Sequence, residues 1–178
     1  LQPFINTRLG EEWEERGGGL EPGVIDARKE AYAAEVPAGV GYLLMGVDVQ
    51  DDRLEYVVRG YGAGEESWLV AFDRVLGDTA IPLGKPGSPW NDLEVLRRRS
   101  WACASGQTVR IFAVAVDTGG HATDAVYAYT GPRYNQRVYA VKGSSTPGAP
   151  LIPRRATRNN KARSPLFVIG ADAAKDLV

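Results

Sequence analysis

Short hydrophobic runs separated by turn-forming residues are the main pattern in this sequence. The first run, residues 42–49, is apolar at nearly every position, which predicts a strand buried on both faces. The turn "QDD" leads to a second strand at about 53–61, and "GAGEE" leads to a third at about 67–76. We therefore expect three consecutive antiparallel strands.

Helical spacing first occurs after a loop rich in Gly and Pro at residues 77–89. Ser88 is suited to the N-cap of a helix, and Pro89 to its first position. Apolar residues then recur at helical spacing as far as Ala104, and Gly106 is a stop signal. The pattern predicts one helix from Pro89 to about residue 104.

Strands and helices alternate in the remainder of the chain. We expect a strand at about 109–116, a helix at about 121–130, and strands at 137–143 and 166–170, with a basic, Pro-rich loop or hairpin before the last. Right-handed crossovers place the 109–116 strand beside the first strand and parallel to it. The predicted fold class is α/β, a mixed sheet in which parallel strands follow three antiparallel ones, with helices on its faces.

Residues 1–40 differ from the rest because they are rich in Glu and Gly and show no sustained period. We interpret them as an acidic linker or arm with a short helix at most, and residues 41–178 as the main domain. The chain begins with Leu1 and stops at "GADAAKDLV", where a helix is just starting. We therefore expect a fragment of a longer protein, truncated near the C-terminus of this domain.

Composition excludes several classes of protein. With one cysteine, Cys103, and one histidine, His121, a zinc site of nitrogen and sulfur ligands is excluded, so any metal would be a hard ion held by carboxylates. No internal disulfide can form, which suits a reducing cytosol. The sequence contains no signal peptide and no apolar run long enough for a membrane span.

Charge is distributed unevenly along the chain. Residues 1–58 contain twelve Asp and Glu against five Lys and Arg, whereas residues 133–163 contain eight Lys and Arg and no acid. A basic block of this kind suits a polyanion, and the absence of aromatic residues among its central cations favours duplex backbone over stacked single strands. The candidate DNA contacts are Arg154, Arg155, Arg158, Lys161 and Arg163.

Two aspartates mark the candidate chemistry. Asp48 interrupts the first apolar run, and Asp117 follows the "VAV" run of the 109–116 strand. If these strands are parallel neighbours, both carboxylates lie at the same edge of the sheet, and a divalent cation would relieve their repulsion. The alternative for Asp48 is that it merely ends the strand and begins a turn.

Five motifs in one order make the chain resemble a known family: "GVDVQDDRLE", "GYGAGEESWL", "VDTGGHATDAVYAY", "RVYAVKGSS" and "VIGADAAK". They resemble the nuclease domain of the large terminase subunit of lambda-type tailed bacteriophages. The resemblance implies an RNase H-like fold and a metal-dependent DNA endonuclease. Such an enzyme cuts concatemeric viral double-stranded DNA during genome packaging, by two-metal-ion phosphodiester hydrolysis with Mg²⁺ or Mn²⁺.

The resemblance also implies roles for individual residues. Asp48 and Asp117 would be catalytic metal ligands, and Lys142, at the end of the 137–143 strand, a contact to phosphate or to the transition state. Weaker candidates are His121, which capping of a helix explains equally well, Glu66 in a hairpin turn, and Asp172. The family's third acid lies further toward the C-terminus, so an incomplete carboxylate set predicts weak or no activity for the fragment.

The same resemblance implies partners and a location: the small terminase subunit, the portal protein and the host bacterial cytoplasm. An ATP-binding motor precedes this domain in the family, and no phosphate-binding G-x-x-x-x-G-K-[ST] motif occurs here. Two alternatives stay open. One is another RNase H-like nuclease of the resolvase or integrase type, and the other is a DNA-clamping or portal-docking module without catalysis.

Overall fold

The computed structural model describes residues 22–27, 29, 31–120, 122–158 and 160–171. The chain divides into two compact units at residues 31 and 32. The first contains the five-residue helix α2 (Pro22–Asp26). The second includes Val36 and Val40 in its hydrophobic core, so the folded domain reaches further toward the N-terminus than residue 41.

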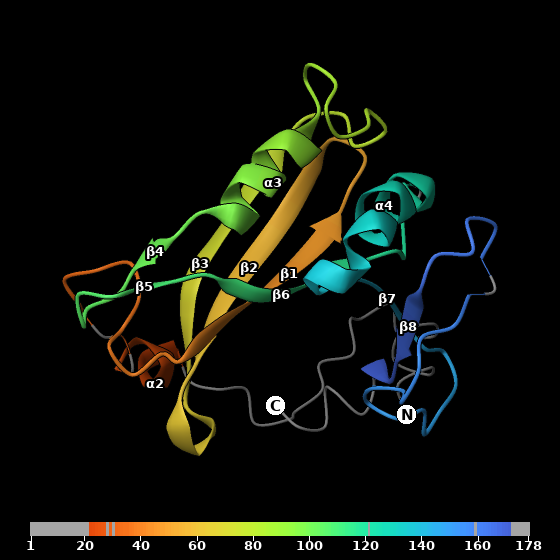
Figure 1. Cartoon of the computed structure of the whole chain (residues 1–178). Helices are drawn as coiled ribbons and strands as arrows, with labels where there is room; N and C mark the ends of the chain where they lie inside the picture. The colour runs from red at the N-terminus through yellow and green to blue at the C-terminus, as the bar shows by residue number, and fades with distance from the viewer. Residues whose placement is uncertain (1–21, 28, 30, 121, 159, 172–178) are drawn as a thin grey trace, which may run out of the picture. The chain divides into compact units, whose positions relative to one another are not determined.

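One six-stranded mixed sheet forms the framework of the second unit (Figure 1), in the order β3-β2-β1-β6-β7-β8. β1 pairs antiparallel with β2, and β2 with β3, whereas β6, β7 and β8 run parallel to β1. The strands are β1 (Tyr42–Val49), β2 (Arg53–Tyr61), β3 (Ser67–Leu76), β6 (Ile111–Asp117), β7 (Val138–Gly143) and β8 (Leu166–Ile169). This is the RNase H-like arrangement, and it confirms the predicted fold class and the parallel pairing of the two acid-bearing strands.

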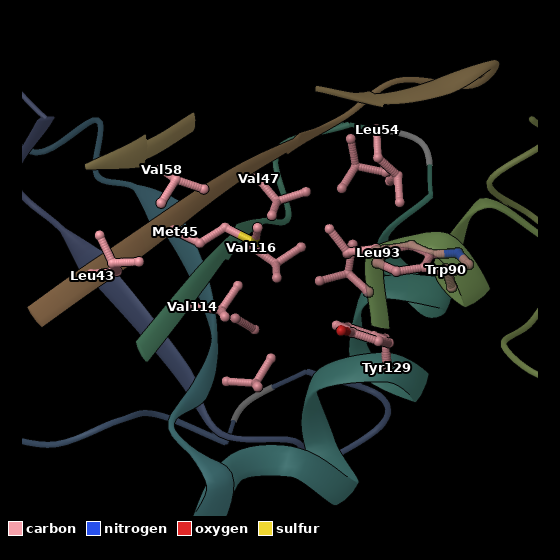
Figure 2. Close-up of a cluster of buried hydrophobic side chains, with 14 of the residues drawn as sticks. Leu43, Met45, Val47, Leu54, Val58, Trp90, Leu93, Val114, Val116 and Tyr129 are labelled. Atoms are coloured by element: carbon pink, nitrogen blue, oxygen red, sulfur yellow. The ribbon is translucent and has the colours of Figure 1, made fainter. Parts of the chain in front are cut away.

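The hydrophobic core lies on one face of this sheet. Figure 2 shows side chains of β1, β2 and β6 directed at Trp90 and Leu93 of α3 (Pro89–Arg98) and at Tyr129 of α4 (Thr123–Thr130). Buried and less buried residues alternate along β1, and residues on the opposite face, among them Tyr42 and Phe72, are exposed. The prediction that β1 is buried on both faces is therefore wrong, because helices cover only the face that carries the alternate apolar residues.

The predicted long helix is shorter than its apolar spacing indicated. α3 ends at Arg98, and Trp101–Ala102 instead form β4, which pairs with β5 (Thr108–Val109). Arg99 has extended backbone, and its guanidinium lies 3.6 Å from the Trp101 ring centroid. The backbone of Val36 bonds to this hairpin, so a contact distant in sequence ends the helix before the stop signal at Gly106.

A partly buried ion network joins α3 to α4 and to the segment after it. Glu94 accepts hydrogen bonds from Arg97, Arg98, Arg133 and the Tyr129 hydroxyl, and its side chain is 14% exposed. Burial raises the pKa of Glu94, but the hydrogen bonds from Arg97 and Tyr129 outweigh it and lower the pKa to about 2. Burial and the neighbouring Glu94 carboxylate raise the pKa of Tyr129.

The domain also contains the 3₁₀ helices η2 (Ala63–Glu65) and η3 (Gly131–Gln136), and long loops between β3 and α3 and between β7 and β8. α4 begins at Thr123, slightly later than expected, and ends at Thr130 as expected, with η3 following directly at Gly131. In the described ranges, no helix is long and apolar enough to cross a membrane.

Candidate active site

Asp48 and Asp117 lie side by side at the carboxyl ends of two parallel strands. Val47 of β1 pairs with Val116 of β6, so the next residue of each strand is an aspartate at the same level. Side chains alternate along a strand, so both carboxylates leave the sheet on the face opposite Val47, Val116 and the helices. Neighbouring strands are about 4.8 Å apart, which suits two carboxylates that share a cation.

Each carboxylate has one polar partner close in sequence. The Gln50 side-chain amide donates to Asp48 Oδ2 at 2.6 Å, and the Gly119 backbone N–H donates to Asp117 Oδ1 at 3.1 Å. Asp117 is partly buried, whereas Asp48 is exposed. The expectation that Asp48 lies inside a buried run is therefore wrong, because its face of β1 carries no helix.

Positive charge does not compensate this pair. In the part of the chain that the structure describes, neither Asp48 nor Asp117 forms an ion pair with a lysine or arginine. Glu55 stands directly across from Asp48 on β2, but Arg53 Nε donates to its carboxylate at 2.7 Å. Two carboxylates without a cationic partner form an attractive site for a hard divalent ion.

The described residues supply two ligands rather than a complete set. Among them, no group of three His, Cys, Asp or Glu side chains is arranged to hold a metal ion. Asp48 and Asp117 would thus share the ion with water, with substrate oxygens or with groups outside the described ranges. The carboxylate oxygens of these two residues fit Mg²⁺ or Mn²⁺ by chemistry.

The "DTGG" loop supports the Asp117 carboxylate. The sequence pattern identified Asp117 but not this role of the loop. A Cβ atom at Gly119 would lie 3.1 Å from Asp117 Oδ2, and one at Gly120 would lie 3.1 Å from the Val49 carbonyl oxygen. The buried Thr118 hydroxyl donates to the Val141 carbonyl at 3.0 Å. Two consecutive glycines, two and three residues after an acid at a strand end, were the available signal for a close backbone approach.

Lys142 and Glu66 are not beside the two aspartates. Asp117 pairs with Val141 on β7, so Lys142 lies at the same edge but its side chain leaves on the opposite, helix-bearing face. Glu66 follows β2, whose last residue pairs with the first residue of β1. It is therefore about 20 Å from Asp48 along the strand, at the other end of the sheet. His121 and Asp172 lie outside the described residues.

The five candidate DNA contacts lie on one basic segment, the chain between β7 and β8. This segment runs along the outer side of the edge strand β8. The Gly170 N–H, just past the end of β8, bonds to the Pro150 carbonyl at 3.0 Å, and Thr157 forms two backbone hydrogen bonds with Leu166 at the start of β8. Five exposed cations lie on this segment, and none of them forms an ion pair within the described ranges: Arg154, Arg155, Arg158, Lys161 and Arg163. The structure thus places uncompensated positive charge two strands away from Asp117.

Comparison with known proteins adds to this geometry. Residues 1–178 match the family described as terminase large subunit gpA, endonuclease domain. The chain is 36% identical to the terminase large subunit of Escherichia phage lambda over 98% of its length, and 36% identical to that of Enterobacteria phage P21 over 100%. It spans 26% and 27% of these two relatives. No solved structure matches the chain.

Proposed function

Because the chain belongs to the endonuclease-domain family of terminase large subunits, we propose that it cuts concatemeric viral double-stranded DNA during genome packaging. The reaction is hydrolysis of a phosphodiester bond assisted by two divalent metal ions. The observation that supports it best is the pairing of Asp48 with Asp117 at the carboxyl ends of adjacent parallel strands, without a cationic partner in the described residues. A carboxylate with a structural role is normally neutralised by cations, as Glu94 is in this same domain.

The proposed ligands of Mg²⁺ or Mn²⁺ are the carboxylates of Asp48 and Asp117. Bound ions would activate a water molecule and stabilise the charge that develops on the attacking and leaving oxygens. The Gln50 amide and the Gly119 N–H hold the two carboxylates in place through the hydrogen bonds described above. This leaves their remaining oxygen lone pairs for the cation.

Substrate contacts follow from the distribution of positive charge. The exposed cations from Arg154 to Arg163 bind DNA phosphates, which position a duplex without reading its sequence. Lys142 leaves the sheet on the helix-bearing face, so its proposed contact is with a flanking phosphate rather than the scissile one. In the whole protein, the small terminase subunit and the portal are the proposed partners, and the host cytoplasm the proposed location.

The test is to replace each aspartate by asparagine in the protein at its natural length. Asp48→Asn or Asp117→Asn should slow Mn²⁺-dependent nicking of supercoiled plasmid by roughly 1,000-fold or more, because each change removes a ligand charge. DNA affinity without divalent ions should stay within about twofold, since phosphate contacts lie elsewhere. Asp73→Asn, an exposed aspartate on β3, is the matched control and should cut normally.

Cleavage that persists in both asparagine variants would contradict this assignment. Loss of DNA binding in step with cleavage would instead indicate that the carboxylates support the fold or a docking surface. If the wild-type protein binds DNA but never cleaves it with Mg²⁺ or Mn²⁺, the module is non-catalytic.

A further inference from the structure

A groove separates α4 from the turn that precedes β8. It has a volume of about 800 Å³, and one wall consists of α4 and η3, with Asp124, Tyr127 and Asn135 among its residues. Arg158, Lys161 and Arg163 line the other wall. Figure 1 shows α4 and β8 on the same side of the domain. Among the described residues that line the groove, one is an acid, Asp124, and three are cations.

The cationic wall of the groove is held in a defined shape. The Asn160 side chain accepts a hydrogen bond from the Ser164 N–H at 2.9 Å and donates to the Ser164 carbonyl at 2.8 Å. Arg163 N–H bonds to the Asn160 carbonyl, and Arg163 has the left-handed value φ 49°. Holding the turn in advance lowers the entropy that binding must overcome.

The groove is separate from the pair of aspartates. Leu166, which follows the turn, pairs with Ala140, and Ala140 pairs with Val116 next to Asp117. The turn is therefore two strands, about 10 Å, across the sheet from Asp117. The groove is bordered by α4, on the helix-bearing face, whereas Asp117 leaves the sheet on the other face. A ligand in the groove does not touch the carboxylates.

We propose that this groove binds the sugar–phosphate backbone of the DNA substrate outside the cut, and that Asn160 is the residue that positions its cations. The inference rests on the proposed function for the identity of the DNA. Guanidinium and ammonium groups supply the charge, and Tyr134 and Asn135 add uncharged hydrogen-bonding groups on the facing wall. These groups contact phosphate oxygens, so the groove adds affinity and orientation without selecting a sequence.

The test measures binding of a duplex of about 30 base pairs by fluorescence anisotropy across a salt series, without divalent ions. It uses the protein at its natural length carrying Asp48→Asn. Adding Arg158→Ala, Lys161→Ala and Arg163→Ala together should lower the slope of log K against log salt by roughly two to three, at about 0.9 per lost contact. The control, Arg59→Ala with Arg74→Ala and Lys85→Ala, removes the same charge from exposed positions outside the groove and should leave the slope unchanged.

Two further variants keep the proposal testable if the triple variant folds poorly. Asn160→Ala keeps every charge and should weaken binding several-fold with an unchanged slope. Ala128→Glu adds a negative charge to the α4 wall at an exposed position and should weaken binding tenfold or more in low salt. In the background that retains Asp48, the groove variants should raise KM for plasmid and leave kcat unchanged.

Equal DNA binding by the groove triple variant and its charge-matched control would overturn the proposal, and an acidic protein partner would then be the better occupant. Failure of the proposed function gives a different result. If the wild-type protein never cuts DNA but the groove variants still flatten the salt slope, the groove assignment stands and the nuclease assignment falls.

Discussion

Two groups of carboxylates in this domain have opposite surroundings. Glu94, in the middle of α3, is mostly buried and is contacted by three arginines and the Tyr129 hydroxyl. Within the described residues, the hydrogen-bond partners of Asp48 and Asp117, at the strand ends, are a neutral amide and a backbone N–H. The first group has its charge neutralised by the protein, whereas the second retains negative charge that a cation can neutralise.

This difference separates an acid that supports the fold from acids that support chemistry. A carboxylate desolvated among fixed cations contributes to stability only while it is ionised. A carboxylate at an open strand end costs little to keep charged and gains energy when a metal ion arrives. The comparison can be tested by changing each group and measuring stability and metal binding separately.

The largest effect on stability is expected at Glu94. Glu94→Gln leaves three arginines beside a neutral amide, and should lower the free energy of unfolding by about 3 kcal/mol. Asp92→Asn, an exposed neighbour on the same helix, should change it by less than about 1 kcal/mol. Urea denaturation at pH 7 measures both. If Glu94→Gln lowered the free energy of unfolding no more than Asp92→Asn does, Glu94 would not be a carboxylate that supports the fold.

Acid should weaken the fold through the same residue. The folded-state pKa of Glu94 is about 2, below its ordinary value of 4.5. Its stabilisation is therefore complete above pH 4.5 and disappears as the pH falls through about 2. The expected loss over this window is about 2 to 3 kcal/mol, and the Glu94→Gln variant should lack that part. Urea denaturation at a series of pH values measures this loss. If the stability of the wild type and of Glu94→Gln fell by the same amount on acidification, the assignment to Glu94 would be wrong.

Metal binding should stabilise the protein through the other group. At free Mn²⁺ tenfold above the dissociation constant, the free energy of unfolding should rise by about 1.4 kcal/mol. Thermal unfolding should show this increment in the wild type and in Asp92→Asn, and no increment in Asp48→Asn or Asp117→Asn. An equal increment in the Asp48→Asn variant would place the ion elsewhere in the chain.

The smallest effect is expected in the loop after Asp117. In Gly119→Ala the new methyl group would lie 3.1 Å from Asp117 Oδ2, so the carboxylate must move by a few tenths of an ångström. We expect Mn²⁺ affinity to fall roughly three- to tenfold, which is about 1 kcal/mol. Unfolding without metal should hardly change. Isothermal titration calorimetry gives the affinity, and an unchanged value would show that the Asp117 position tolerates this shift.

Local patterns were sufficient to predict β1, β2 and β3, whose observed bounds agree with the predicted ranges. Each is a short run bounded by turn-forming or loop residues, so residues close in sequence determine it. The end of α3 could not be predicted in this way. Trp101 continues the helical spacing, but pairing of β4 with β5 and bonds from Val36 compete successfully for that segment.

The candidate site was only partly predictable for a similar reason. The positions of Asp48 and Asp117 followed from two apolar runs and the handedness of crossovers. Their faces did not, because an alternating pattern shows which residues share a face but not which face the helices cover. Lys142 is an example of this limit. It lies at the expected edge of the sheet, but its side chain is on the face opposite the two aspartates.

The sequence by itself determined the order of strands and the placing of an acid at the end of each of two parallel neighbours, because both depend on local periodicity and chain connectivity. Only the tertiary structure decided which charges are neutralised and which are not. Arg133 reaches Glu94 from a separate element, and the turn at Asn160 comes to lie against α4. These contacts between residues distant in sequence depend on how the helices and loops pack on the sheet, and no single segment of the chain specifies that packing.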